Sequence, residues 1–554
     1  MPHDLSLIST IAAGFGLALV LGFVAVRLKM PPLVGYLLAG VAIGPATPGF
    51  VANVALAGQL AEIGVMLLMF GVGLHFSLAD LLAVKRIAVP GAILQIAVAT
   101  ALGVGTAMGW GWSFGGALVF GLALSVASTV VLLRALEARG EVESLNGRIA
   151  VGWLIVEDLV MVLVLVLLPP LAPVLKGDAG GGGLGMTVLI TLGKVAGFIV
   201  FMLVVGKRLF PRLLWLAART GSRELFTLCV VVAAVGVAYG SALLFDVSFA
   251  LGAFFAGMMM RESEFAHRAA DESLPLRDAF SVLFFVSVGM LFDPRVLVDQ
   301  PLQVLAVVAI ILVGKTLAAI ALVLAFRYPL RSALTVGASL AQIGEFSFIL
   351  AALGVSLGLL SPAGQSLILA GALISISLNA LLFKAIGPLE AWPALRRFEA
   401  GDDPLSMLPD NVDPRRLQGL VVLVGHGRVG RRIAEQLLAA GIPYIVVEEN
   451  RELVEKLRAG GVHAVCGDAA DPAVLVQSHV AQARLLVVAS PDTFSVRQMA
   501  ETARALNPGI EIVVRTHSDE EAALLQGEQV ARAFVGEHEL AQGMAAHVVA
   551  RLRA

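Results

Sequence analysis

The chain has 554 residues, of which 58% are hydrophobic and only 14% are charged, and its mean hydropathy is +0.89. Soluble proteins have about a quarter of their residues charged, so this composition excludes a wholly soluble protein and indicates many membrane-spanning segments. The net charge is −2 and no basic cluster stands out, so no nucleic-acid partner is predicted.

The first 390 residues are expected to form a polytopic α-helical membrane domain. A transmembrane helix needs about 20 apolar residues, and thirteen apolar segments qualify or come close. They lie at 5–27, 32–46, 56–77, 87–109, 114–136, 146–170, 187–209, 224–239, 243–260, 277–292, 302–326, 331–354 and 362–387. Residues 391–418 form a linker rich in proline and charge, 419–535 a soluble domain, and 536–554 a helical tail.

Cationic residues follow the odd-numbered predicted helices. The loop between the seventh and eighth helices holds five of them, whereas the loops after even-numbered helices hold only Lys176 and Arg295. Lys and Arg accumulate in cytoplasmic loops. We therefore predict an external N-terminus and, after thirteen crossings, a cytoplasmic soluble domain.

Two predicted helices are polar at mid-depth, where a plain span would be Leu and Val. The fifth contains Ser125, Ser128 and Thr129, and the twelfth contains Gln342, Gly344, Glu345 and Ser347. These helices correspond if helices 1–6 and 8–13 are inverted repeats joined by the seventh. We expect both to be broken helices whose freed backbone groups line an ion path, the alternative being close packing through small residues.

Asp158 and its neighbour Glu157 lie in the sixth predicted helix. A carboxylate at mid-membrane depth costs roughly 2.5–3.5 kcal/mol on insertion scales and by default indicates ion or proton handling. A structural salt bridge between helices is the alternative. Lys315 has the equivalent place in the second repeat and is the predicted partner of Asp158. A cation bound to the carboxylate would take that partner away, so the lysine would release its proton. The two side chains therefore suggest cation/proton exchange.

Seven motifs resemble the monovalent cation:proton antiporter-2 family, in particular its Kef-type potassium efflux systems and YbaL-like members. They are PPLVGYLLAGVAIGP (31–45), EIGVMLLMFGVGLHFS (62–77), GLALSVASTVV (121–131), GRIAVGWLIVEDLVMV (147–162), FAGMMMRESEF (255–265), FSVLFFVSVGMLFD (280–293) and QIGEFSFIL (342–350). The resemblance implies a homodimer in a bacterial inner membrane, in contact with lipid, with a scaffold, a mobile core and a crossover of the two broken helices.

By the same resemblance Asp158 is the ion-binding aspartate and Lys315 the core lysine, with Ser125, Ser128, Thr129, Gln342 and Glu345 lining the site. K⁺ is the implied cargo. Kef-type proteins commonly have Gln where this chain has Glu157, so Na⁺ and the stoichiometry stay open. Adjacent helical residues point about 100° apart, so the two carboxylates need not share one ion.

The soluble part begins with a dinucleotide-binding fingerprint. GHGRVG at 425–430 follows the predicted strand 420–425 and opens a helix, and the next strand, YIVVE, ends at Glu448. Glycines let the backbone approach phosphate, and an acidic residue about 20 positions on binds the ribose. A doubly wound domain with an empty site is the alternative. The fingerprint predicts that Gly425, Gly427, Gly430 and Glu448 bind the nucleotide.

This domain resembles the TrkA-type regulator of potassium conductance (RCK) N-domain, an α/β Rossmann-like fold. The resemblance implies that the nucleotide-binding residues also include His426, Arg428, Val429, Asp468 and Arg515. The resemblance implies NAD(H) or AMP as a regulatory ligand, while Glu448 argues against NADP. No substrate domain or catalytic base accompanies it, so we expect a sensor rather than an enzyme. The alternatives to an antiporter are a nucleotide-gated potassium channel and a membrane-bound oxidoreductase. The chain has no filter segment such as TVGYG, and a further regulatory subunit is not predicted.

Overall fold

The structure is a computed structural model, which describes residues 6–48, 50–75, 78–137, 139, 141–142, 144–177, 184–245, 247–261, 263, 265–390, 392, 405, 407–408, 419–489, 493–516, 519–527 and 532–553. The chain divides into two compact units, residues 1–399 and 400–554. The predicted linker, 391–418, lies almost entirely outside the described residues.

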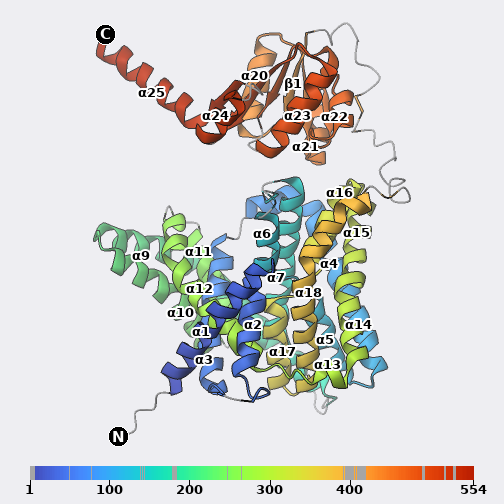
Figure 1. Ribbon diagram of the computed structural model, residues 1–554. Coiled ribbons are helices and arrows are strands. Elements are labelled where there is room, and N and C mark those ends of the chain that lie inside the picture. The colour runs from blue at the N-terminus through green and yellow to red at the C-terminus, as the bar shows by residue number, and fades with distance from the viewer. Residues whose placement is uncertain are drawn as a thin grey trace. The chain divides into compact units, whose positions relative to one another are not determined.

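The first unit is built from helices alone among its described residues (Figure 1). Its first half contains α1 (Ser6–Arg27), α2 (Pro32–Ile43), α3 (Val54–His75), α4 (Leu78–Gly109), α5 (Phe114–Ser125), α6 (Thr129–Glu137) and α7 (Leu145–Leu175). A long connector follows, made of α8 (Leu184–Phe201), the π-helical turn η1 (Met202–Gly206) and α9 (Lys207–Arg219). The second half contains α10 (Arg223–Phe245), α11 (Phe249–Arg261), α12 (Ala266–Met290), α13 (Val296–Asp299), α14 (Pro301–Ala309), the π-helical turn η2 (Ile310–Lys315), α15 (Thr316–Ala325), α16 (Leu330–Leu340), α17 (Glu345–Ser356) and α18 (Pro362–Glu390).

Each of the thirteen predicted segments overlaps a described helix. Within the described part of the chain, nine helical segments are long and apolar enough to cross a membrane, and the bent pair α16–α17 makes ten, while α2 and α11 are shorter. Several predicted bounds were wrong. Helix α4 begins at Leu78 rather than at 87, and α7 continues to Leu175 through three prolines. The connector runs on to Arg219 because η1 joins its two helices without a break.

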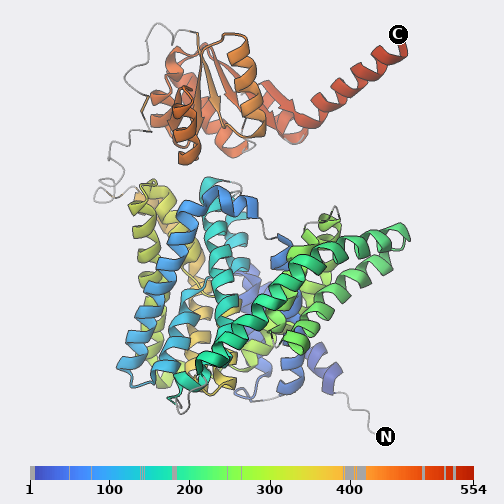
Figure 2. The same cartoon turned by 180° about the vertical axis from the view of Figure 1, so that it is seen from behind.

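The helices form two groups that correspond to the halves of each repeat (Figures 1 and 2). Helices α1–α3 pack with α10–α12, and α4–α7 pack with α14–α18. The first three helices of each predicted repeat therefore lie in one group and the last three in the other. This arrangement fits the predicted inverted repeats.

Both predicted broken helices are interrupted. The fifth span stops at Ser125 and resumes at Thr129, and the twelfth stops at Leu340 and resumes at Glu345 with a bend of 42°. Irregular backbone at membrane depth is tolerated only where protein or a wet cavity surrounds it. Every residue of the two breaks is buried, so these breaks lie inside the helix packing.

The second unit contains one parallel sheet in the strand order β3-β2-β1-β4-β5-β6. The strands are β1 (Val421–Val424), β2 (Tyr444–Glu448), β3 (Ala464–Cys466), β4 (Leu485–Val488), β5 (Glu511–Thr516) and β6 (Arg532–Val535). The helical elements are α20 (Arg428–Ala439), α21 (Arg451–Ala459), α22 (Pro472–Gln477), the 3₁₀ turn η4 (Val480–Gln482), α23 (Thr493–Leu506), α24 (Asp519–Gly527) and α25 (Gly536–Arg553).

Helices cover both faces of this sheet. Leu423 and Val446 pack with α20 and α21 on one face, while Val422 and Val424 pack with α22–α24 on the other. From β1 the chain adds β2 and β3 on one side and then β4, β5 and β6 on the other side, so the topological switch point lies between β1 and β4. Ligands of open α/β sheets bind at the carboxyl edge of such a switch point. The sequence did not predict the sixth strand. Helix α25 occupies the predicted helical tail and projects from the domain (Figure 1).

Candidate functional site

The two broken helices touch at their interruptions. The backbone N–H of Ser128 donates to Oε1 of Gln342 over 2.8 Å, and Nε2 of Gln342 donates back to the Ser128 carbonyl over 3.0 Å. Gly344 lies against Ser128 so closely that an added Cβ would overlap the Ser128 side chain. A glutamine amide, with both a donor and an acceptor, thus satisfies backbone groups that the first break leaves free.

Asp158 and Glu157 project from α7 toward the first break and make different contacts. Oδ2 of Asp158 accepts a hydrogen bond from the Thr129 hydroxyl over 3.1 Å, and Oε2 of Glu157 accepts one from the Ala127 N–H over 2.8 Å. Asp158 is 4% exposed and Glu157 is fully buried. The second oxygen of each carboxyl group has no hydrogen-bond partner among the described residues. Two buried oxygens are therefore available to a proton or a cation.

Glu345 is the first residue of α17, and its carboxyl group lies at the N-termini of two half-helices. Its Oε2 accepts a hydrogen bond from the Ser128 hydroxyl over 2.8 Å, and the carboxyl group also interacts with its own backbone and that of Thr129, where α6 begins. Helix N-termini carry partial positive charge. Glu345 is therefore placed to neutralise the positive ends of α6 and α17.

Lys315 lies near the negative end of a half-helix, whereas Glu345 lies near two positive ends. Lys315 ends the π-helical turn η2, is completely buried, and donates from Nζ to the Gln342 carbonyl over 3.2 Å. That carbonyl follows the C-terminus of α16, where the helix dipole is negative. An ammonium group here stabilises the carbonyl end of the broken helix.

The predicted pairing of Lys315 with Asp158 is wrong in this structure. Within the described part of the chain no carboxylate lies within 4.0 Å of Nζ, and the charge that acts on Lys315 is that of Glu157. The charges acting on Asp158 are those of Glu345 and Glu157, both negative. Glu157 and Asp158 point in different directions from α7, so only Glu157 turns toward η2.

A thermal-stability cycle tests this pairing. Lys315→Gln should lower the free energy of unfolding because it leaves a buried carboxylate without its positive neighbour. Adding Glu157→Gln should restore part of the loss, with a coupling of about 0.5–3 kcal/mol for interacting neighbours. The measurement is the melting temperature of the purified protein in detergent. The matched control is the double variant Lys315→Gln/Asp158→Asn. If its melting temperature recovered more than that of Lys315→Gln/Glu157→Gln, the partner of Lys315 would be Asp158, as predicted from the sequence.

Two polar residues of this region were missed in the sequence. Gln95 of α4 is fully buried, donates to the Ser125 carbonyl over 3.0 Å, and accepts from the Trp153 indole over 3.4 Å. Asn379 of α18 donates to the Ala338 carbonyl over 2.8 Å. An amide inside an apolar span was the signal that could have found Gln95 and Asn379. Ser125 was predicted to line the site, but its hydroxyl donates to the Leu122 carbonyl of its own helix.

The glycine loop of the second unit joins β1 to α20. Gly425 has φ +84°, a left-handed conformation that favours glycine. A Cβ at Gly430 would overlap the Gly425 carbonyl oxygen, so glycine is required where the helix crosses the strand. A Cβ at Gly427 would meet nothing within 4 Å. The space beside Gly427, at the N-terminus of α20, is therefore open to a ligand, and an anion is the favoured occupant there.

The other predicted nucleotide-binding residues lie along the carboxyl edge of the sheet. Glu448 ends β2 and accepts from the backbone N–H groups of His426 over 2.7 Å and Asn450 over 3.1 Å. Asp468 follows β3 and accepts from the Ala470 N–H. Arg515, in β5, is two strands from the loop, about 10 Å away at the usual strand spacing. Arg428 and Val429 form the first turn of α20.

Burial lowers the pKa of His426 below its usual range, although the nearby Glu448 carboxylate opposes this effect. The imidazole is therefore neutral at pH 7. The positive charge available to an anion at this loop comes instead from the N-terminus of α20 and from Arg428.

Comparison with known proteins identifies both units. Residues 15–387 match the family model of the sodium/hydrogen exchanger transmembrane region, which is two thirds of the chain. The chain belongs to the sodium/hydrogen exchanger family. Residues 421–535 match the TrkA-N domain. The family consists of cation/proton antiporters, so this chain is a membrane protein of a transporter class with a TrkA-N domain attached.

Relatives extend over both units of this exchanger. It is 54% identical over 545 residues, 98% of its length and 97% of the relative's, to the Escherichia coli K12 protein named as the cation/proton antiporter YbaL. It is 30% identical over 501 residues to an Alkalimonas amylolytica protein named as the K⁺ efflux antiporter KefB, covering 90% of this chain and 75% of that one. The sodium/proton antiporter MjNhaP1 of Methanocaldococcus jannaschii shares the fold, with a TM-score of 0.52 and 16% identity over 69% of this chain and 99% of that one.

Proposed function

We propose that this exchanger moves K⁺ against protons by alternating access, with Asp158 as the residue that binds either ion. The observation that carries the proposal is the position of Asp158, which is buried beside both broken helices with one oxygen unpartnered. K⁺ is preferred to Na⁺ because a relative over most of the chain is named as a K⁺ efflux antiporter.

Exchange follows from the charges around Asp158. The residues that act on it are two further carboxyl groups, and no ammonium or guanidinium lies within ion-pairing distance among the described residues. A buried carboxylate without a positive partner is very costly. Asp158 therefore binds a proton or a cation, and the two compete for the same oxygens. A carrier that crosses only when one of them is bound exchanges one for the other.

Flux from proteoliposomes separates this proposal from its two alternatives. An antiporter moves K⁺ only with opposite proton movement, whereas a nucleotide-gated channel passes K⁺ at equal pH on both sides and without proton movement. A Na⁺/H⁺ antiporter would show the coupling with Na⁺ and not with K⁺.

We further propose that NAD(H) or AMP binds the TrkA-N domain and regulates the rate of exchange. The open space beside Gly427 supports a bound phosphate, and Glu448 supports a ribose without a 2′-phosphate. By the distribution of Lys and Arg in the loops, the N-terminus is external and the TrkA-N domain cytoplasmic. The protein is proposed to be a homodimer of a bacterial inner membrane.

Gly427→Val tests the nucleotide site. Because an added Cβ meets nothing within 4 Å, the domain should fold normally, and the larger side chain should block only the ligand. We expect loss of NAD(H) and AMP binding, measured by isothermal titration of the purified full chain. Glu448→Ala should weaken binding less, through the lost ribose contact. Transport rates should lose their response to the nucleotide, while the preference between K⁺ and Na⁺ should stay unchanged.

Gly543→Val is the matched control, since a Cβ there also meets nothing within 4 Å but the residue lies in α25, away from the glycine loop. It should bind nucleotide as the wild type does. Undiminished affinity in Gly427→Val would place the binding site elsewhere, and an altered ion preference would show that the two units do not act separately.

A further inference from the structure

Helix α9, the last part of the connector, has one covered face and one bare face. Phe210 and Leu214 are buried against the membrane unit. On the bare side, Leu209, Leu213, Trp215 and Leu216 are between 39% and 60% exposed. A helix with large apolar side chains on an uncovered face and charges beside them is typical of a helix lying in a membrane interface.

The charges beside these apolar residues form a stripe of arginines. At 100° per residue, Arg208, Arg212 and Arg219 fall within about 40° of one another around α9. All three side chains are exposed. The guanidinium group of Arg219 lies 4.8 Å from the ring centroid of Trp215, so the tryptophan flanks the same stripe. We call these three residues the α9 arginine stripe.

Two arginines of the stripe carry charge that no described neighbour compensates. Arg208 and Arg212 make no hydrogen bond, ion pair or ring contact with any described residue. By contrast, Arg277 pairs with Asp278, and Arg268 lies over the Phe226 ring.

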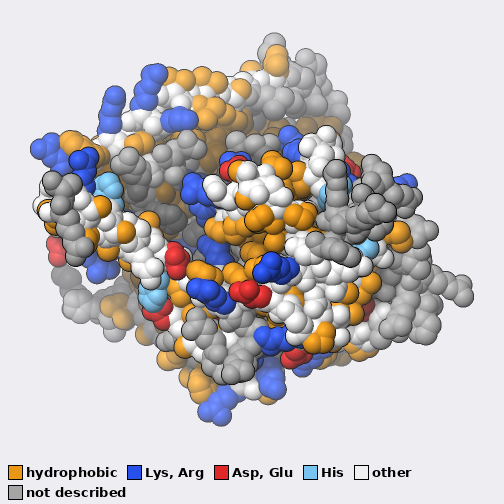
Figure 3. Space-filling model, turned by 90° about the horizontal axis from the view of Figure 1, so that it is seen from above, with side chains coloured by type: hydrophobic (Ala, Val, Ile, Leu, Met, Phe, Trp, Pro, Cys, Tyr) orange, Lys and Arg blue, Asp and Glu red, His pale blue; other side chains and the backbone are white. Residues whose placement is uncertain are grey.

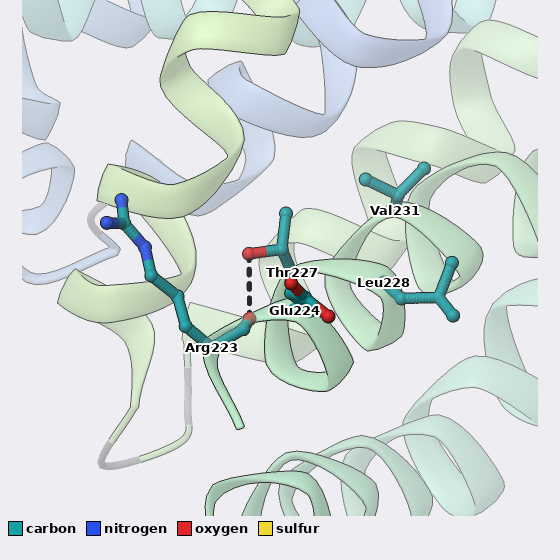
Figure 4. Close-up of a pocket in the computed structure, with 5 residues that line it drawn as sticks. All are labelled: Arg223, Glu224, Thr227, Leu228 and Val231. Carbon is teal, nitrogen blue, oxygen red and sulfur yellow. Dashed lines mark hydrogen bonds between the residues drawn. The ribbon is translucent and has the colours of Figure 1, made fainter. Parts of the chain in front are cut away.

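The neighbouring groove at the start of α10 is not the cationic site. It measures about 410 Å³ and is lined by Arg223, Glu224, Thr227, Leu228 and Val231 (Figure 4). Arg223 already donates to both oxygens of Glu272, over 2.8 and 3.0 Å, so its charge is compensated. The uncompensated positive charge next to this groove is that of the α9 arginine stripe.

We propose that the α9 arginine stripe binds the phosphate groups of anionic phospholipids in the cytoplasmic leaflet. A guanidinium group matches phosphate geometry through two parallel hydrogen bonds. The adjacent leucines would enter the acyl region, and Trp215 would lie at headgroup level, where tryptophan is enriched. Figure 3 shows Lys and Arg side chains beside hydrophobic ones at the upper left of the face seen from above. This proposal does not depend on the exchange mechanism.

Native mass spectrometry of the purified full chain tests it, because bound lipids are counted directly. Dioleoyl-phosphatidylglycerol and dioleoyl-phosphatidylcholine are titrated separately, since they share acyl chains and differ in headgroup charge. The wild type should retain phosphatidylglycerol in preference. In Arg208→Gln/Arg212→Gln the affinity for phosphatidylglycerol should fall about 30-fold, which corresponds to about 1 kcal/mol for each arginine near a lipid surface.

Arg327→Gln/Arg331→Gln is the control, because it removes the same charge from another loop and should leave the affinity unchanged. Equal binding of phosphatidylglycerol in the wild type and the α9 variant would overturn the proposal, as would full competition by soluble glycerol 3-phosphate. Dissociation of a dimer caused by the α9 substitutions alone, without lipid, would show that a second copy of the chain covers this face, and would also overturn it.

Discussion

Asp158→Asn should abolish cation-driven proton movement while leaving the protein inserted and folded. Asparagine keeps the shape of the side chain and can still accept the Thr129 hydrogen bond, but it can neither release a proton nor offer a negative charge to a cation. The measurement is the fluorescence of a pH-sensitive dye in proteoliposomes after addition of K⁺. The signal should fall to that of protein-free vesicles.

Glu62→Gln is the matched control for this substitution. Glu62 is also a carboxylate in a predicted membrane helix, but it is exposed on α3 and lies away from the broken helices. Its removal should leave transport unchanged. Wild-type exchange in Asp158→Asn would mean that another carboxyl group, Glu157 or Glu345, carries the ion.

Gly344→Ala should disrupt the contact between the two broken helices. The added Cβ would overlap the Ser128 side chain and lie 2.5 Å from the Ser128 Cα, and the backbone there cannot move without breaking the hydrogen bonds to Gln342. Overpacking of this kind costs about 1–3 kcal/mol and sometimes more. We expect a lower melting temperature in detergent and loss of exchange, because the half-helices would no longer hold Asp158 and Glu345 in place.

Gly240→Ala in α10 provides the comparison, since a Cβ at that position meets nothing within 4 Å. It should leave both the melting temperature and the exchange rate unchanged. If Gly344→Ala also retained the wild-type melting temperature and exchange rate, the two broken helices would be packed less tightly than the contacts of Gly344 indicate.

The carboxylates and the breaks could be predicted because polar residues in apolar spans are a sharp signal. Asp158, Glu345 and Gln342 stand out where lipid or close packing would otherwise demand Leu and Val. The structure places all three at one junction. The glycine loop could also be predicted, because the backbone requires glycine at two of its positions. Gly425 has a positive φ, and a Cβ at Gly430 would overlap the Gly425 carbonyl oxygen.

The partner of Lys315 could not be predicted in the same way. Spacing in a regular α-helix gives the direction of each side chain, but η2 is a π-helical turn that ends at Lys315. Its extra residue rotates the following helix by about 100°, and nothing in the apolar sequence around it signals that turn. Neighbouring Glu157 and Asp158 differ by the same angle, so the choice between them needed the structure.

Simultaneous recording of K⁺ and proton flux in the same proteoliposomes, with the membrane potential clamped at zero, tests the central proposal most directly. Coupled exchange through Asp158 predicts that an outward K⁺ gradient drives proton uptake, that an imposed pH gradient drives K⁺ the other way, and that neither flux persists without the other. Steady K⁺ flux at equal pH, with no proton movement and no loss in Asp158→Asn, would contradict it.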